Sequence, residues 1–339
     1  MVNSLSPSLR RVVVLGTGGT IAGRAASGAD NIGYTAGEVG VADLLGGIDA
    51  PAGLALVAEQ VAQLDSKDMA FDVWLQLAGR CAFWLAEADV AGVVITHGTD
   101  TIEETAFFLQ AVLAPGKPVV MTCAMRPASS LSPDGPQNLR DAIAVAATPA
   151  AQGVTVVCAG AIHGALDVQK VHTYRPDAFS SGDAGPVGYV EEGAVRRLRD
   201  WPQAVGGASK LPEAKAGVAV CWPRVEIVTS HAGASGALVD LLLQERAAGV
   251  AEPVRGLVVA ATGNGTVHHA LEAAALRAQD AGVAVLRATR CANGRILPKP
   301  GDLLRDAGAL TPVKARVALM LELMETVGGR DGDAGGRRG

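Results

Sequence analysis

The amino-acid sequence, 339 residues long, lacks the marks of a membrane, nucleic-acid-binding or metal-centred protein. No apolar run approaches the ~18 residues that a membrane-spanning helix needs. Lys and Arg form no block within the part expected to fold, and the net charge is −5, which argues against nucleic acid as a ligand. The five cysteines are odd in number and include no CxxC pair. We therefore expect neither a disulfide framework nor a metal site, and no motif indicates a cofactor.

The N-terminus leaves little room for a secretory signal, which would need ~7–15 apolar residues and a cleavage site before the mature fold. Here the first motif already begins at Gly16. We therefore expect a cytoplasmic protein without a membrane partner, whose cysteines are buried thiols in a reducing compartment. The cysteines are Cys81, Cys123, Cys158, Cys221 and Cys291.

Short apolar runs alternate with helical patterns in the first half of the chain. Hydrophobic residues make up 49% of the sequence and charged residues 19%, a balance typical of globular proteins. The strand candidates, rich in β-branched residues, are Val12–Leu15, Gly92–Thr96, Val119–Cys123 and Val154–Ala159. Strands buried on both faces have this composition, so the sequence predicts an α/β fold with a mostly parallel sheet flanked by helices.

Two helices are expected between these strands. The first spans Thr101–Leu113, with apolar residues on one face, and Thr101 with Glu104 fits a capping box. The second spans Asn138–Ala147 and follows Pro136, a residue typical of a first helical turn.

The length suggests two domains at ~150 residues per domain. We expect a larger N-terminal α/β domain over 1–195, a polar linker over 196–215, a smaller C-terminal α/β domain over 216–327, and a disordered tail over 328–339. In the C-terminal domain the strand candidates are Val218–Cys221, Val225–Val228, Leu257–Ala261 and Val283–Ala288, and the helix candidates are Ala237–Ala247 and Val267–Gln279.

The first candidate functional motif, GTGGTIAG over 16–23, directly follows a predicted strand. Ligands of open α/β sheets bind beyond the carboxyl ends of the strands. The motif lacks the Gly-Lys-Ser/Thr ending of a P-loop, and Ile21 stands where GxGxxG needs its third glycine. What remains is the hydroxyl of Thr20 on a tight glycine loop, or a sharp turn without chemistry.

The second motif, His97 to Thr101, ends another strand and opens the capped helix. A helix N-terminus can stabilise an oxyanion during acyl transfer, although Asp100 could simply cap the helix. We expect a structural role for His97. Lys170 is a third candidate, because a lysine that loses its hydration can act as a base. Together Thr20, Thr99 and Lys170 supply the groups of a threonine-nucleophile hydrolase.

The motifs TGGTIAG and ITHGTDTIEETA closely resemble the two signature segments of the bacterial-type L-asparaginase family. The resemblance continues through MTCAMRPASSLSPDGPQNL, DVQK, GPVGY, ATGNG and TPVKARVALML, in order along the folded chain. It implies a two-domain α/β protein, usually a homotetramer built as a dimer of dimers. In such an assembly each active site lies between the N-terminal domain of one subunit and the C-terminal domain of its neighbour.

The resemblance also implies a role for individual residues. Thr20 matches the nucleophile, Tyr34 the tyrosine of a closing loop, Thr99 and Lys170 the proton relay, Asp100 the partner of the substrate's α-ammonium, Ser66 the partner of its α-carboxylate, Ala124 a carbonyl that receives the amide nitrogen, and Asn264 an asparagine from the neighbouring subunit.

Two departures concern substrate range. Lys67 stands where the family often has Gln, and it either pairs with the substrate carboxylate or points to solvent. No Glu occurs between Glu272 and Glu322, where many relatives bring one to the substrate amine. The expected function is hydrolysis of L-asparagine, with a mixed glutaminase–asparaginase, or less favoured a non-catalytic amino-acid-binding protein, as alternatives. Direct attack by a water positioned by Thr99 is a variant of the mechanism.

Overall fold

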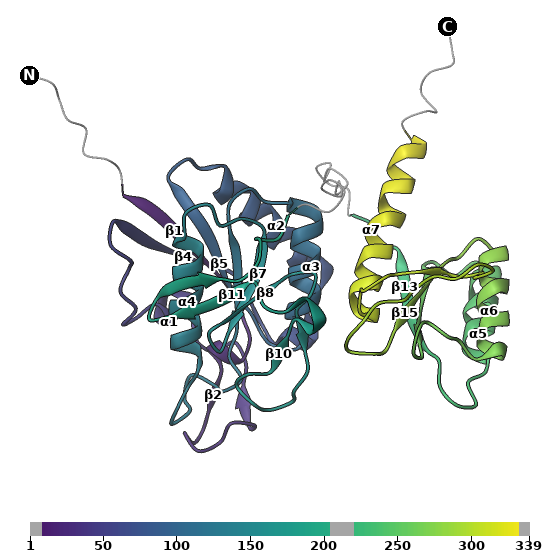
Figure 1. Ribbon diagram of the computed structural model, residues 1–339, viewed down its shortest axis with the longest axis horizontal. Coiled ribbons are helices and arrows are strands. Elements are labelled where there is room, and N and C mark those ends of the chain that lie inside the picture. Colours follow the sequence, from purple (N-terminus) through teal and green to yellow (C-terminus); the bar gives the residue numbers. More distant parts are fainter. Residues whose placement is uncertain (1–8, 204–219, 332–339) are drawn as a thin grey trace, which may run out of the picture. The chain divides into compact units, whose positions relative to one another are not determined.

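The structure is a computed structural model, and it describes residues 9–203 and 220–331 (Figure 1). The chain divides into an N-terminal and a C-terminal unit, with the division between residues 208 and 209. No helix within the described ranges combines the length and apolar character that crossing a bilayer requires.

The N-terminal unit is built on an eight-stranded sheet with the order β12-β11-β8-β7-β6-β5-β1-β4. Its strands are β1 (Arg10–Gly18), β4 (Leu54–Leu64), β5 (Val90–Thr96), β6 (Val119–Thr122), β7 (Val154–Cys158), β8 (Ala161–Gly164), β11 (Gly188–Glu191) and β12 (Ala194–Arg197). From β4 to β7 the neighbouring strands are parallel, and from β7 to β12 they are antiparallel. The predicted mostly parallel sheet is confirmed.

Helices cover both faces of this sheet, which explains why β5, β6 and β7 are buried throughout. The helices are α1 (Val41–Leu44), α2 (Phe71–Ala86), α3 (Ile102–Leu113) and α4 (Gly135–Ala147). Helices α1 and α4 share one apolar cluster with the sheet, while α2 and α3 pack on each other and on the opposite face (Figure 1).

Several short elements lie between the main strands and helices along the chain of the N-terminal unit. They are the 3₁₀ turns η1 (Thr20–Ala22), η2 (Ser66–Asp68) and η3 (Gly182–Ala184), the pair β2 (Arg24–Ala25) and β3 (Tyr34–Thr35), and the pair β9 (Gln169–Lys170) and β10 (Phe179–Ser180). Several candidate residues lie in these elements or beside them.

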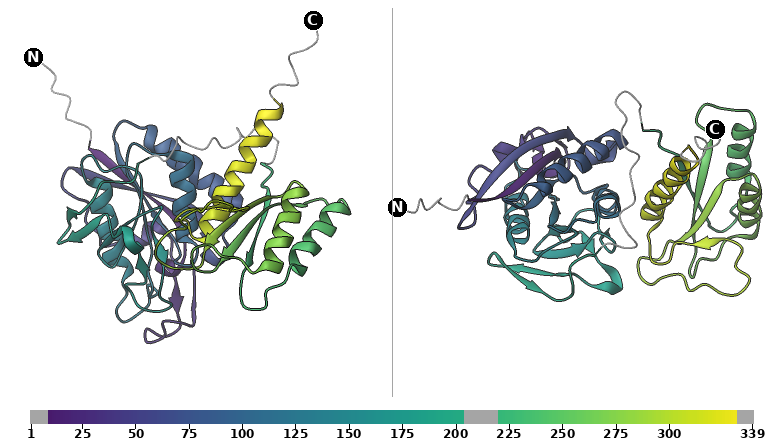
Figure 2. Two further views of the ribbon diagram at one scale, coloured as in Figure 1. Left: turned by 45° about the vertical axis from the view of Figure 1, so that its right-hand side comes forward. Right: turned by 90° about the horizontal axis from the view of Figure 1, so that it is seen from above.

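The C-terminal unit is a smaller parallel sheet with the order β13-β14-β15-β16. Its strands are β13 (Arg224–Thr229), β14 (Val254–Ala261), β15 (Ala284–Thr289) and β16 (Arg305–Asp306), and its helices are α5 (Ala237–Ala247), α6 (His269–Asp280) and α7 (Pro312–Asp331). Helices α5 and α6 pack on one face and α7 on the other (Figure 2). The predicted second α/β domain is therefore confirmed as a fold.

Three local predictions differ from the structure. Thr101 precedes α3, but its side chain makes no capping bond and instead donates to the carbonyl of Ser66, so the capping box is wrong. The strand predicted over 218–221 falls partly outside the described residues, and residues 220–221 are not in a strand. Cys221 and Cys291 are exposed, so buried thiols are found only at Cys81, Cys123 and Cys158, and all five cysteines are free.

The predicted linker and tail also begin within regular structure. Arg196 and Arg197, at the start of the linker over 196–215, belong to β12, where the Arg196 guanidinium pairs with Glu191 and lies over the ring of Tyr189. The polar composition thus marks an exposed edge strand. Trp201 is buried, and residues 204–215 lie outside the described part. Helix α7 includes residues 328–331 of the predicted disordered tail, and 332–339 lie outside the described part.

Candidate active site

The loops that follow β4, β1 and β5 meet at one edge of the sheet because these neighbouring strands are parallel. Gly19 has φ 82°, a conformation that favours glycine. A Cβ on Gly19 would collide with the backbone of Gly98, and a Cβ on Gly98 would collide with the side chain of Ser66. The glycines therefore allow three loops, each with a candidate hydroxyl, to come into direct contact.

Thr20 is buried and opens η1 immediately after this glycine contact. Its hydroxyl lies 2.6 Å from the hydroxyl of Tyr34. The ring of Tyr34 lies against Gly23, where a Cβ would approach the ring carbon Cδ2 to 2.8 Å. The antiparallel pairing of β2 with β3 returns Tyr34 to the Thr20 loop.

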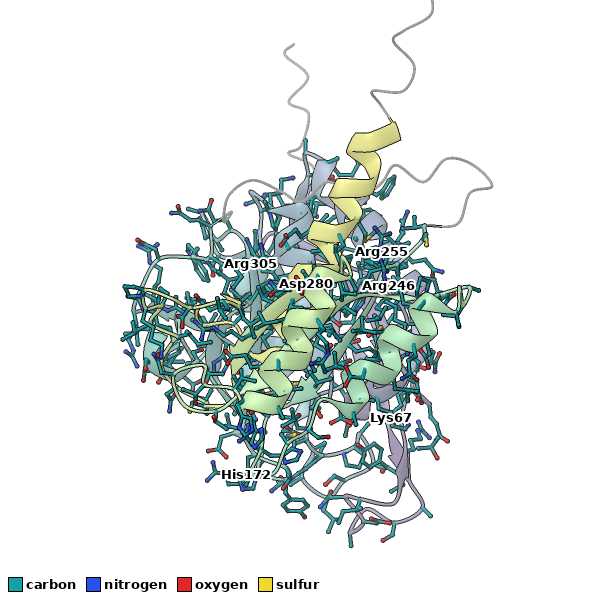
Figure 3. The ribbon with its side chains drawn as sticks, turned by 90° about the vertical axis from the view of Figure 1, so that its right-hand side faces the viewer. Lys67, His172, Arg246, Arg255, Asp280 and Arg305 are labelled. Carbon is teal, nitrogen blue, oxygen red and sulfur yellow. The ribbon has the colours of Figure 1, made fainter. Side chains whose placement is uncertain are left out.

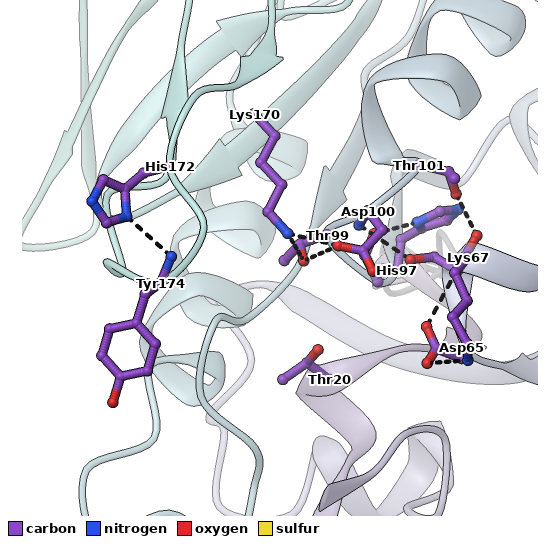
Figure 4. A network of polar contacts seen from close by, with 12 residues as sticks. Thr20, Asp65, Lys67, His97, Thr99, Asp100, Thr101, Lys170, His172 and Tyr174 are labelled. Atoms are coloured by element: carbon purple, nitrogen blue, oxygen red, sulfur yellow. Dashed lines mark hydrogen bonds and ion pairs between the residues drawn. The ribbon is translucent and has the colours of Figure 1, made fainter. Parts of the chain in front are cut away.

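Lys170 lies beside the second motif, although the sequence separates them by 70 positions. Its Nζ donates to the Thr99 hydroxyl at 2.8 Å and to the Asp100 carboxylate at 2.7 Å. The Lys170 side chain is 20% exposed, so the ammonium is only partly hydrated. Figure 4 shows Thr20 near the group formed by Thr99, Asp100 and Lys170. A hydroxyl bonded to a lysine can relay a proton to and from a nucleophile.

Ser66 links the loop after β4 to the start of α3. Its hydroxyl oxygen accepts the backbone N–H of Asp100 at 3.2 Å, and its carbonyl accepts the hydroxyl of Thr101 at 2.8 Å. Ser66 is buried, whereas the Asp100 side chain is 54% exposed. The site therefore combines a largely exposed carboxylate with buried hydroxyls on neighbouring loops.

His97 is fully buried, and its hydrogen bonds favour the structural role that the sequence predicts. The indole N–H of Trp74 donates to Thr105 Oγ1 at 2.9 Å, and Thr105 lies 3.1 Å from His97 Nε2. His97 Nδ1 lies 2.8 Å from the carbonyl oxygen of Gly98. A carbonyl can only accept, so Nδ1 carries the proton and Nε2 accepts from Thr105. Burial lowers the pKa of His97 to about 4, although the Gly98 carbonyl opposes the shift.

Lys67 is held by its own loop. Its ammonium forms ion pairs with Asp65 at 2.7 Å (Figure 4) and with Asp68 at 3.1 Å. The Lys67 side chain, which is labelled in Figure 3, is 61% exposed. The two neighbouring carboxylates raise the pKa of Lys67, chiefly through the hydrogen bond to Asp65. Of the two alternatives for Lys67, this geometry favours the one facing solvent.

Ala124 lies just beyond the end of β6 and is fully buried in a small cluster with Ile21, Ala22 and Val39. The cluster joins Ala124 to the loop that carries Thr20, because Ile21 directly follows Thr20 in the sequence. Asn264 belongs to the C-terminal unit and sits in a turn closed by reciprocal backbone bonds between Thr262 and Thr266.

The side-chain amide of Asn264 is itself engaged. It donates to the carbonyl of Leu297 at 3.0 Å and accepts the Leu297 N–H at 2.8 Å. Its part in a neighbour's site stays a prediction.

Two residues at the N-terminal end of α4 contact the Ala124 backbone region, and sequence reasoning assigned them no role. Asp134 accepts the backbone N–H groups of Met125 and Arg126, and Asn138 donates to the carbonyl of Cys123. The segment PDGPQN that contains both residues is part of the family resemblance. An acid just before a helix usually indicates a cap, so the pattern alone hides this contact.

Comparison with known proteins adds independent findings. Residues 11–203 match the family model "Asparaginase, N-terminal", and residues 224–331 match "Glutaminase/Asparaginase C-terminal domain". L-asparaginase 2 of Escherichia coli (strain K12) is 37% identical, over 94% of this chain and 90% of the relative. L-asparaginase 2 of Bacillus subtilis (strain 168) is 35% identical, over 94% and 84%. Glutaminase-asparaginase of Pseudomonas fluorescens biotype A is 34% identical, over 94% and 87%.

A solved structure has the same fold. The crystal structure of a probable cytoplasmic L-asparaginase from Campylobacter jejuni superposes with a TM-score of 0.85 at 34% identity, and the match covers 93% of this chain and 95% of that one. The two family models together span most of the described residues, and the resemblance seen in the sequence is confirmed. The chain belongs to the asparaginase family.

Proposed function

We propose that this protein is an L-asparaginase, an amidohydrolase that converts L-asparagine to L-aspartate and ammonia through a threonine nucleophile. The observation that carries the proposal is the bond of the Lys170 ammonium to the Thr99 hydroxyl, on the loop whose Gly98 touches the Thr20 loop. The names of the relatives, L-asparaginase and glutaminase-asparaginase, support the substrate class.

In the proposed first half-reaction the Thr20 oxygen attacks the side-chain amide carbon of asparagine. A bond from oxygen to carbon forms and the carbon–nitrogen bond breaks. The Thr20 proton passes to Thr99, and Thr99 passes its own proton to Lys170, which must be an uncharged amine at this step and then supplies the proton for the departing nitrogen. The departing nitrogen gains a proton and leaves as ammonia. Backbone N–H groups near Thr99 hold the oxyanion, and oxyanion stabilisation and general base assistance each contribute roughly 10²–10⁴ in rate. Water then hydrolyses the aspartyl ester on Thr20.

Substrate binding uses the remaining candidates. Asp100, whose exposed carboxylate is already bonded to one ammonium group, binds the α-ammonium of the substrate. Ser66 binds the α-carboxylate, and the carbonyl of Ala124 receives the amide nitrogen. Tyr34 orients the Thr20 hydroxyl through their 2.6 Å contact. Lys67 forms ion pairs with Asp65 and Asp68 of its own loop.

A mixed glutaminase–asparaginase is the second candidate, since one group of relatives carries that name. The two amides differ by one methylene, and a methylene in a pocket discriminates by only about 1–3 kcal/mol. Ammonia release with each amide, compared as kcat/KM, separates the candidates. A protein that only binds amino acids would release no ammonia from either, and that result would overturn the proposed activity.

Assembly and location complete the proposal. We infer a homotetramer in which Asn264 of one subunit contributes to the site of a neighbour, and light scattering at several protein concentrations tests this. A cytoplasmic location is supported by three buried free thiols and by the probable cytoplasmic relative of known structure. Cell fractionation tests it, because another relative is named a probable periplasmic L-asparaginase.

A further inference from the structure

We propose that Asp134 and Asn138 are positioning residues that aim the carbonyl of Ala124 at the departing nitrogen of the substrate. The inference rests on the proposed function, in which that carbonyl receives the amide nitrogen. It assigns a role to two side chains at the start of α4 that touch backbone rather than substrate.

The sheet itself leaves the Ala124 backbone without ladder partners. The pairing of β6 with β7 ends at Thr122 and Val157, so the residues beyond these positions need other hydrogen bonds. Asn138, only 2% exposed, bridges the two strand ends. Its Nδ2 donates to the carbonyl of Cys123 at 2.9 Å, and its Oδ1 accepts the N–H of Ala159 at 2.9 Å.

Asp134 fixes the peptide group that contains the Ala124 carbonyl. The carbonyl of Ala124 and the N–H of Met125 are the two ends of one planar peptide, and no described peptide bond is cis. Asp134 Oδ2 accepts that N–H at 3.0 Å, and Oδ1 accepts the next one, of Arg126, at 2.9 Å. Since the N–H points at Asp134, the Ala124 carbonyl points the opposite way.

The same bond also makes the carbonyl a stronger acceptor. A carboxylate that accepts a peptide N–H polarises the whole peptide group, and bonds to ionised groups are about twice as strong as neutral ones. The Ala124 oxygen therefore carries more negative charge, which favours the amide nitrogen as it takes up a proton and gains positive charge on departure.

Helix capping does not explain Asp134. It occupies the N-cap position of α4, yet its side chain makes no capping bond there. Packing holds the turn from the other side, because a Cβ on Gly135 would lie 2.8 Å from Ile21 and 3.5 Å from the Cβ of Ala124. The carboxylate is thus directed to the 125–126 backbone, and the turn has little room to rotate.

The test compares two substrates that share the acyl group and differ in the leaving atom. The leaving group of L-asparagine is the side-chain amide nitrogen, which donates to the Ala124 carbonyl and departs as ammonia. The leaving group of the β-methyl ester of L-aspartate is an oxygen without a hydrogen. Both give the same aspartyl-enzyme, and kcat/KM covers only binding and acylation. The change in the ratio of the two kcat/KM values between variant and wild type therefore reports how the enzyme treats the two leaving groups. The ratio is also independent of the fraction of folded enzyme.

Asp134→Asn is the variant, because one carboxamide cannot accept both backbone N–H groups and must turn an NH₂ toward one of them. We expect Asp134→Asn to lower the amide-to-ester ratio of kcat/KM about tenfold or more, because a good hydrogen bond corresponds to about that factor. Asn138→Ser should also lower this ratio. Asp141→Asn is the matched control on the same helix, where the carboxylate bonds Gln137 instead, and should leave the ratio unchanged.

An unchanged ratio in Asp134→Asn, with amide and ester activity falling together, would overturn the inference and leave the proposed function standing. A wild-type protein that releases ammonia from neither amide and cleaves no ester would overturn both. The wild-type rates distinguish these two failures, because the wild type is active in the first case and inactive in the second.

Discussion

Protonation of His97 should destabilise the N-terminal unit within a defined pH window. Burial lowers the pKa of His97 from 6.5 to about 4. As pH falls, the unfolded chain takes up the proton near pH 6.5 and the folded chain only near pH 4. The stability contribution of neutral His97 is therefore complete above pH 6.5 and is lost as pH falls toward 4.

The size of the effect follows from the shift, at 1.36 kcal/mol for each pKa unit. The full loss amounts to about 3 kcal/mol, of which about 2 kcal/mol is lost by pH 5. Solvent screens little of this interaction, because His97 is fully buried. Structurally, a second ring proton on Nε2 would face the Thr105 hydroxyl that now donates to it.

Urea unfolding followed by tryptophan fluorescence, at one protein concentration and at several pH values between 7.5 and 5, measures this loss. His97→Asn removes the titrating group and retains a donor for the Gly98 carbonyl. Its free energy of unfolding should be lower at pH 7.5 but should depend on pH less steeply than wild type, by about 2 kcal/mol over this range. Equal pH dependence in the two proteins would refute the reasoning, as would an NMR titration in which the folded His97 ring protonates near pH 6.5.

Three further predictions test the site and the core. Lys170→Met should lower kcat/KM for asparagine by roughly 10²–10⁴ with an unchanged circular dichroism spectrum, because it removes the proton relay; activity within threefold of wild type contradicts this. Gly98→Ala should separate the loops by collision with Ser66 and cost about 1–3 kcal/mol on thermal unfolding together with most of the ammonia release, whereas an active, equally stable variant would disprove the contact. In the native protein only Cys221 and Cys291 should react with a thiol reagent, and the other three cysteines only after unfolding; three or more fast thiols would contradict the burial.

The parts of the fold that the sequence predicts are those with a strong local signal. The strands β5, β6 and β7 are buried on both faces, and so they appear as continuous β-branched runs. β4 (Leu54–Leu64) is partly exposed and carries Glu and Gln, so its pattern does not distinguish a strand. Helix α7 contains Lys314, which is fully buried, and a charged residue at such a position obscures the apolar face that would predict the helix.

The candidate site divides in the same way. Thr20 and Thr99 lie in glycine-containing motifs after strands, where topology places ligands. Each motif alone also fits a turn or a helix cap, so their proposed roles depend on the resemblance to the asparaginase family. Lys170 was grouped with Thr99 by its chemistry and by the family resemblance, and no local pattern shows that the two side chains meet, because their contact spans 71 positions. The contacts of Asp134, which we propose as a positioning residue, could not be predicted because its partners are backbone N–H groups, and every residue except proline has one.

Ammonia release by Thr20→Ala, compared with Thr20→Ser, tests the central claim most directly. The two variants differ by one hydroxyl at a buried position that faces Tyr34. If Thr20 is the nucleophile, the alanine variant should lose about 10³-fold or more in kcat for asparagine, while serine, which retains the oxygen, should keep measurable turnover. An alanine variant that is folded and releases ammonia within tenfold of the wild-type rate would contradict the account.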